Sequence, residues 1–301
     1  MKFTICQESR VGQRRNNQDR IAHCYSRDAL FMVVADGMGG HLQGEVAAEI
    51  AVTEITRLFQ QEARNRLRRP SDFLVSVINS AHRAIVSHAV AENLLESPRT
   101  TCVACIVQGG TATWAHAGDS RLYVLREGRL VAATQDHSRV QQMVDAGTLT
   151  PEAAARHPDR NKVYSCLGGV VPPMVAVGRE FPLQAGDTIV LSTDGFWAQV
   201  PPALIAAQLR KQDIVSLMPE LLSEAHRRAR GESDNLSVVA MTWERQDDAR
   251  ASDALRTGDG DFRGSADTVQ LGGETPAEDV SEADIEKAIA EIQNAIRKVP
   301  R

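Results

Sequence analysis

Short apolar runs alternate with turn residues along the first 245 residues, and this pattern predicts many strands. The expected strands are Phe3–Glu8, Ile21–Ser26, Leu30–Ala35, Thr101–Gln108, Thr111–Ala117, Arg121–Arg126, Val175–Pro182, Thr188–Ser192 and Leu236–Glu244. Several neighbouring strands are joined by short turns, such as Gly109-Gly110 and Glu127-Gly128. We therefore expect antiparallel sheets rather than repeated parallel units.

Helices are predicted between these strands. Two long ones are expected at Gly44–Glu62 and Ser71–Ala91, because apolar residues recur there at helical spacing. Pro70 lies at their junction, where one helix must stop and the next must start. The shorter helices expected are Val140–Ala146, Pro151–Arg156, Pro202–Gln208 and Ile214–Arg230.

The composition changes near residue 245, which predicts that residues 1–245 form the folded domain. Residues 246–280 have few large apolar side chains and are interpreted as a flexible linker. At 281–301, four isoleucines and Val299 are spaced 4, 3, 4 and 3 residues apart, which predicts a short amphipathic helix. A helix this short needs its apolar face buried, so we expect it to dock on its own domain, on a second copy or on a partner. A free, partly helical tail is the alternative.

Composition and charge narrow the class of protein. The formal net charge of −5 gives no support for nucleic acid as a partner. No apolar stretch is long enough to span a membrane, and the N-terminus lacks the pattern of a signal peptide, so a cytoplasmic location is expected. The five cysteines are expected to be reduced. Cys102 and Cys105 have CxxC spacing, but they lie inside an apolar run and are interpreted as buried thiols.

Aspartates beside the ends of predicted strands carry the chemical signal. Asp36, Asp119, Asp194 and Asp234 all adjoin strand ends, and Asp19 comes shortly before another. A strand fixes the position of such a carboxylate, and several of them converging make an all-oxygen site for Mg²⁺ or Mn²⁺. Any single aspartate of this kind is more often an ordinary turn residue. Five in one chain weaken that reading.

The ordered motifs around these aspartates resemble those of PPM-type (type 2C) metal-dependent protein Ser/Thr phosphatases in their bacterial form. The resemblance covers about residues 3–244. Its motifs are Arg14-x-x-Asn17-Gln18-Asp19, Val34-Ala35-Asp36-Gly37-Met38-Gly39-Gly40, Gly44-Glu45-Val46-Ala47-Ala48, Thr100-Thr101, Ala117-Gly118-Asp119-Ser120-Arg121, Thr134-Gln135-Asp136-His137-Ser138, Leu167-Gly168, Leu191-Ser192-Thr193-Asp194-Gly195 and Asp234-Asn235-Leu236-Ser237.

This resemblance implies an α+β fold, a four-layer α-β-β-α sandwich in which two antiparallel β-sheets pack face to face and helix pairs flank them. It also implies two Mn²⁺ or Mg²⁺ ions at one edge of the sandwich. Asp36 would bridge them, and Gly37 would offer its backbone carbonyl to one. Asp194 and Asp234 would hold the other.

Three further roles follow from the same resemblance. Asp19 would hold metal-bound waters, Asp119 would contribute to a weaker third metal site, and Arg14 would grip the substrate phosphate. Three places depart from the family pattern. Pro98-Arg99 stands before Thr100-Thr101, where a small residue such as glycine is expected, and this concerns the local loop alone. Met38 stands where animal members carry a histidine suggested as general acid, and Gln18 replaces a glutamate found in many members.

The implied function is hydrolysis of phosphoserine and phosphothreonine in proteins by a metal-activated water, against an opposing Ser/Thr kinase. A catalytically weak relative acting as a regulatory binding module is the alternative, which the full set Asp36, Asp194 and Asp234 disfavours. A two-metal phosphodiesterase would usually draw on histidines. The resemblance also suggests that residues 138–162 are a mobile flap beside the cleft. His137, which leads into it, is expected to be a surface or structural residue.

Overall fold

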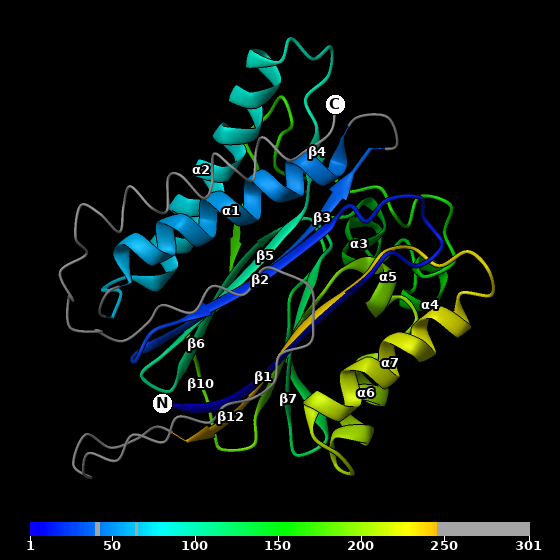
Figure 1. The fold of residues 1–301 in the computed structure, drawn as a ribbon. Coiled ribbons are helices and arrows are strands. Elements are labelled where there is room, and N and C mark those ends of the chain that lie inside the picture. The colour runs from blue at the N-terminus through cyan, green and yellow to red at the C-terminus, as the bar shows by residue number, and fades with distance from the viewer. Residues whose placement is uncertain (40–42, 64–65, 246–301) are drawn as a thin grey trace, which may run out of the picture. The chain divides into compact units, whose positions relative to one another are not determined.

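The computed structural model describes residues 1–39, 43–63 and 66–245. Within these ranges, two antiparallel sheets lie face to face and helices cover both outer faces (Figure 1). This arrangement confirms the α-β-β-α fold that the family resemblance implies. The predicted linker at 246–280 and the predicted helix at 281–301 lie outside the described residues, so both stay predictions.

The first sheet contains both ends of the described chain. Its strand order is β1-β12-β11-β7-β8, and every neighbouring pair is antiparallel. The strands are β1 (Lys2–Arg10), β7 (Arg121–Arg126), β8 (Arg129–Ala133), β11 (Thr188–Ser192) and β12 (Leu236–Arg245). The last strand, β12, therefore lies between the first strand and β11.

The second sheet is built from the middle of the chain. Its main order is β10-β6-β5-β3-β2, while β4 pairs with β3 and β9 pairs with β6. The strands are β2 (Asp19–Tyr25), β3 (Ala29–Met38), β4 (Arg99–Thr100), β5 (Cys102–Gln108), β6 (Thr111–Ala117), β9 (Ala176–Val177) and β10 (Phe181–Pro182).

Two helix pairs form the outer layers (Figure 1). Helices α1 (Gly44–Glu62) and α2 (Pro70–Ala91) cover the second sheet, and α6 (Pro202–Leu209) and α7 (Ile214–Arg228) cover the first. The remaining helices are α3 (Arg139–Asp145), α4 (Pro151–Ala154) and α5 (Asp194–Trp197). No helix among the described residues is long and apolar enough to cross a bilayer.

Strand β3 is buried on both faces, which explains its unbroken apolar run. Phe31 packs towards the helix layer, where its ring stacks on Phe59 of α1 with the centroids 4.9 Å apart. Met32, the next residue, points instead into the core between the sheets. The same alternation separates the two cysteines of the CxxC sequence. Cys102 faces the helices and Cys105 faces the other sheet, and both are free, buried thiols as expected.

Apart from shifts of one to three residues at element ends, the structure differs from the predicted elements at four places. Strand β4 (Arg99–Thr100) was not predicted, because two residues are too few to form a pattern. Strand β8 (Arg129–Ala133) was not predicted, because its side chains are largely exposed at a sheet edge and lack a buried stripe. Helix α5 was not predicted either, because its four residues are too few to show helical periodicity. The strand predicted at Val175–Pro182 is two short strands, β9 and β10, separated by Gly178, Arg179 and Glu180.

Candidate active site

Five aspartates lie close together where strands of both sheets end. Asp19 and Asp36 occupy opposed positions of β2 and β3. Asp194 begins α5 just after β11, Asp234 comes shortly before β12, and Asp119 lies between β6 and β7. Asp36 interacts electrostatically with each of the other four. The structure thus brings together all five aspartates that the sequence analysis selected.

Backbone contacts hold Asp36 in place. Its N–H donates to Oγ1 of Thr101 (3.1 Å), and its carbonyl accepts from the Thr101 N–H and from Oγ1 of Thr100, each at 2.9 Å. The next residue must be glycine, because a Cβ on Gly37 would lie 2.2 Å from the carbonyl oxygen of Gly44. The start of α1 therefore packs directly against the backbone that follows Asp36.

The other strand ends are tied together by side chains that bond to the backbone. Oγ1 of Thr193 donates to Oδ2 of Asp19 at 2.9 Å. The amide of Asn235 donates to the carbonyls of Val11 and Asn16, and its Oδ1 accepts from the Gln18 N–H at 2.8 Å. Asn235 thus holds the loop before β2 against the start of β12. The sequence analysis placed Asn235 in a motif but gave it no role.

Burial and mutual repulsion disfavour the charged form of the aspartates in this cluster. Burial raises the pKa of Asp19 to about 7 and the pKa of Asp194 to about 6. Burial also raises the pKa of Asp36 and the pKa of Asp119 well above the usual range. Repulsion from neighbouring aspartates adds to all four shifts. Such a cluster favours either protons or cations among its oxygens.

The donor set fits hard divalent cations, because the five side chains offer only carboxylate oxygens. In the described ranges, however, no three His, Cys, Asp or Glu side chains converge as a closed metal site. Oδ2 of Asp234 is engaged by Nη2 of Arg14, 2.7 Å away. The carboxylates repel one another, and that of Asp234 is already paired with Arg14. We therefore expect their oxygens to converge only when cations are bound.

A cleft of about 450 Å³ opens beside this cluster. Arg14, Asp194 and Asp234 line it, whereas Asp19, Asp36 and Asp119 do not. The lining also includes Arg160 and Asn161, which follow α4 in the segment predicted to be a flap. The sequence analysis missed both as site residues, because nothing in the pattern of that segment marks them.

The histidine that leads into this segment is structural. His137 is buried, and its ring stacks between those of His116 and Tyr164, with centroids 4.6 and 5.6 Å away. The backbone N–H of His137 donates to the carbonyl of Gly118 at 2.9 Å, and its ring Nδ1 accepts from the Gly118 N–H at 3.4 Å. Burial lowers the pKa of His137 to about 4, so the ring is neutral near pH 7.

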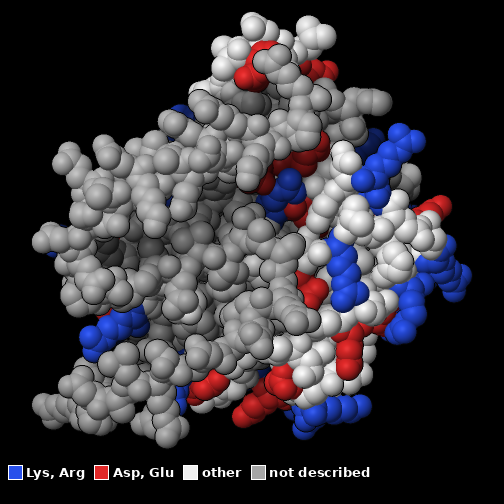
Figure 2. All heavy atoms as spheres, viewed as in Figure 1, with Lys and Arg blue, Asp and Glu red and all other residues white. Residues whose placement is uncertain are grey.

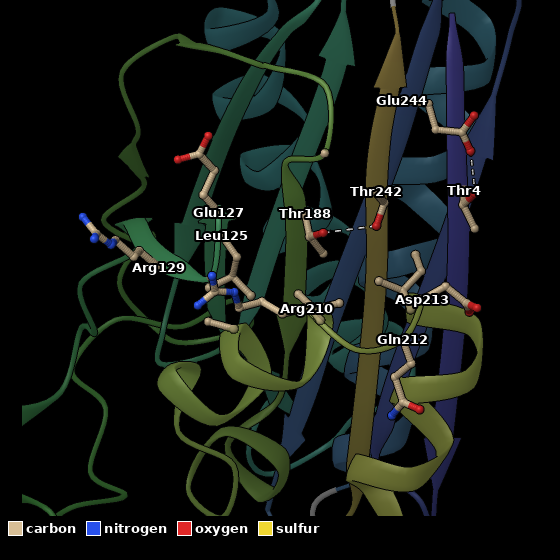
Figure 3. A pocket seen from close by; sticks show the side chains of 15 residues that line it. Thr4, Leu125, Glu127, Arg129, Thr188, Arg210, Gln212, Asp213, Thr242 and Glu244 are labelled. Atoms are coloured by element: carbon tan, nitrogen blue, oxygen red, sulfur yellow. Dashed lines mark hydrogen bonds between the residues drawn. The ribbon is translucent and has the colours of Figure 1, made fainter.

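A larger cavity of about 920 Å³ lies at the opposite end of the first sheet (Figure 3). Thr4, Thr188 and Thr242 line it in one row across three strands, and the connection from α6 to α7 borders it. None of the predicted site residues lines this cavity. The aspartate cluster therefore remains the candidate active site.

On the described part of the face in Figure 2, acidic and basic side chains are interspersed.

Comparison with known proteins defines the class. Residues 6–237 match the family protein phosphatase 2C. The serine/threonine protein phosphatase PstP of Mycobacterium tuberculosis is 35% identical over 231 residues, which cover 75% of this chain and 42% of that protein. The serine/threonine phosphatase of S. agalactiae has a similar structure, with a TM-score of 0.73, 31% identity and coverage of 81% of this chain and 100% of that one.

A third comparison concerns metals. The catalytic domain of PstP, solved in complex with two manganese ions, superposes with a TM-score of 0.67 and 30% identity, over 80% of this chain and 97% of that one. The family match, these relatives and the manganese complex together define the class of the chain as a metal-dependent phosphoprotein phosphatase. The chain belongs to the protein phosphatase 2C family. The family that the sequence motifs resemble is thus confirmed.

Proposed function

We propose that this chain hydrolyses phosphoserine and phosphothreonine esters of proteins at a two-metal aspartate site. One observation carries the proposal: five buried or half-buried aspartates from both sheets meet beside a cleft that Arg14 also lines. Phosphoproteins are the substrate class, and an opposing Ser/Thr kinase follows as the partner system. The bacterial relatives named as serine/threonine phosphatases support this assignment.

Four positions would hold two Mn²⁺ or Mg²⁺ ions. Asp36 would bridge them, the carbonyl of Gly37 would bind one, and Asp194 and Asp234 would bind the other. The two manganese ions of the PstP catalytic domain support this number and one of these metals. When bound, such ions act as Lewis acids that lower the pKa of a water and neutralise charge on phosphoryl oxygens.

Two more aspartates complete the proposed set. Asp119 would contribute to a weaker third metal position. Asp19 lies opposite Asp36 and accepts from Thr193. Its carboxylate would hold waters bound to the metals. Its raised pKa means that, without cations, this carboxyl is partly protonated near neutral pH.

Arg14 would bind the phosphate of the substrate. Its side chain is 61% exposed and lines the cleft, and its guanidinium pairs with Asp234. Oδ2 of Asp234 accepts from Arg14, so Arg14 would compete with a cation for this oxygen. We therefore infer that Arg14 turns from Asp234 to the phosphate oxygens in the loaded enzyme, where a guanidinium can bond two oxygens at once.

The leaving alkoxide needs a proton from elsewhere than residue 38. Met38 carries no titratable group, so a solvent water in the cleft is the simplest donor. Arg160 and Asn161 would contact residues next to the phosphorylated one, since they line the cleft and none of the proposed metal ligands comes from their segment. The reading as a catalytically weak binding module is not favoured, because the aspartate set is complete.

Phosphate release from a phosphothreonine peptide, with Mn²⁺ and with a chelator, tests this function. Wild type should be active only with metal, and Asp36→Asn and Asp194→Asn should each abolish turnover in a protein that stays folded. Asp72→Asn is a matched control, since its side chain is 70% exposed on α2. Full activity in either site variant would contradict the two-metal assignment.

A further inference from the structure

Trp197 makes a contact that the proposed reaction does not use. Its indole Nε1–H donates to the backbone carbonyl of Asp119 at 2.9 Å. Trp197 is the last residue of α5, whose first residue is Asp194. The bond therefore links the backbone of one aspartate of the cluster to the short helix that carries another.

The indole ring is itself clamped. The guanidinium carbon of Arg121 lies 3.4 Å from the ring centroid. Arg121 in turn makes two hydrogen bonds of 2.8 Å to the carboxylate of Asp136 and one of 3.2 Å to the hydroxyl of Tyr123. Because a bidentate pair fixes the plane of the guanidinium, the stacked indole has little freedom to turn its N–H away from Asp119.

The residues on either side of Asp119 are anchored to other elements. A Cβ on Gly118 would lie 2.6 Å from the side chain of Thr101, and the φ of Gly118 is +114°, so this turn requires glycine. Oγ of Ser120 bonds to Oγ1 of Thr101 at 2.7 Å. Thr101 also bonds to the backbone of Asp36. The turn is thus held towards Asp36 on one side and, through Trp197, towards Asp194 on the other.

From these contacts we infer that Trp197, clamped by Arg121 and Asp136, is a positioning residue that sets the direction of the Asp119 carboxylate towards the cluster. The inference rests on the proposed function, in which Asp119 contributes to the weaker third metal position. Without the indole N–H, the turn keeps its two neighbouring anchors, but the carbonyl of Asp119 loses this partner and the carboxylate gains freedom to turn away.

Calorimetric titration of the metal-free protein with Mn²⁺ tests this role without any substrate. Trp197→Phe keeps an aromatic ring for Arg121 and removes the N–H donor together with part of the ring volume. We expect it to weaken the weakest Mn²⁺ step by about three- to tenfold, the effect that one hydrogen bond supports. Asp119→Asn should weaken the same step at least as much. Trp114→Phe, which alters a buried indole packed on Phe181, should leave the titration unchanged.

Thermal unfolding in chelator provides the second readout. If Trp197 only filled space, Trp197→Phe would lower the unfolding temperature and leave Mn²⁺ binding as in wild type, and that result would overturn the inference. An unaltered titration in Asp119→Asn would instead overturn the third-site assignment on which it rests. Should Trp197→Phe fail to fold, Arg121→Lys loosens the clamp while keeping the indole, and the same weakened step is expected.

Discussion

The raised pKa of Asp19 makes a quantitative prediction about the metal-free protein. A carboxyl whose pKa is higher in the folded state than in the unfolded state binds a proton on folding. Its cost to stability is absent below pH 4, the unfolded value, and grows until the pH passes about 7, the folded value. We therefore expect the free energy of unfolding in chelator to fall as the pH rises from 4 to 8.

Asp19→Asn removes this titration while keeping an oxygen that can accept from Thr193. Asp19 is only 2% exposed, and a shift of about three pKa units corresponds to ~4 kcal/mol. Its neighbours share the same protons, so we expect a gain of about 2–4 kcal/mol at pH 8 and almost none at pH 4. That gain corresponds to an unfolding temperature roughly 5–15 °C higher at pH 8.

Thermal unfolding followed by circular dichroism at pH 4 and pH 8, both in chelator, measures this difference. Asp72→Asn removes the same charge from an exposed position and should show no such dependence on pH. Adding Mn²⁺ should stabilise wild type more than Asp19→Asn, because the carboxylate then has a cation nearby. If the difference in stability between Asp19→Asn and wild type were the same at pH 4 and pH 8, the electrostatic reasoning would be refuted.

Three other predictions concern substrates and the tail. Arg14→Ala should raise KM for small phosphate esters several-fold with a smaller loss of kcat, and Arg14→Lys should recover only part of the loss; an unchanged KM in steady-state assays would remove Arg14 from phosphate binding. Arg160→Ala should raise KM for a phosphopeptide but not for a small ester, and equal effects on both would place Arg160 at the phosphate itself. Removing residues 246–301 should leave metal-dependent hydrolysis of a small ester nearly intact, because every proposed ligand precedes residue 245; loss of that activity would show that the domain boundary is wrong.

Much of the fold could be predicted because its strands are bounded by strong local signals. Strands β6, β7 and β11 begin and end where the sequence predicts, since turn residues flank apolar runs. Strand β8 gives no such signal, because an exposed edge strand needs no buried stripe. The pairing of β1 with β12 lies beyond local pattern, since it joins the two ends of the described chain. The α-β-β-α arrangement itself came from the family motifs rather than from periodicity.

Some residues of the candidate site could likewise be predicted from the sequence, and others could not. Its aspartates could be found because each stands beside a strand end in a recognisable motif. Arg160 enters the cleft only through the path of the segment after α4, and Trp197 reaches Asp119 only because α5 packs beside the β6–β7 turn. Neither contact can be predicted from the spacing of residues in the sequence. The metal roles, the boundary at residue 245 and the cytoplasmic location stay predictions.

The pairing of β1 with β12 has a consequence for the making of this protein on the ribosome. Residues 19–117 contain β2, β3, β5 and β6, which pair with near neighbours and can assemble while synthesis continues. Among the strands that the structure describes, β1 is made first, whereas its partner β12 (Leu236–Arg245) is made after all the others. Since Asp234 arrives with that partner, we expect a nascent chain to have an open sheet edge and no phosphatase activity until residue 245 has left the exit tunnel.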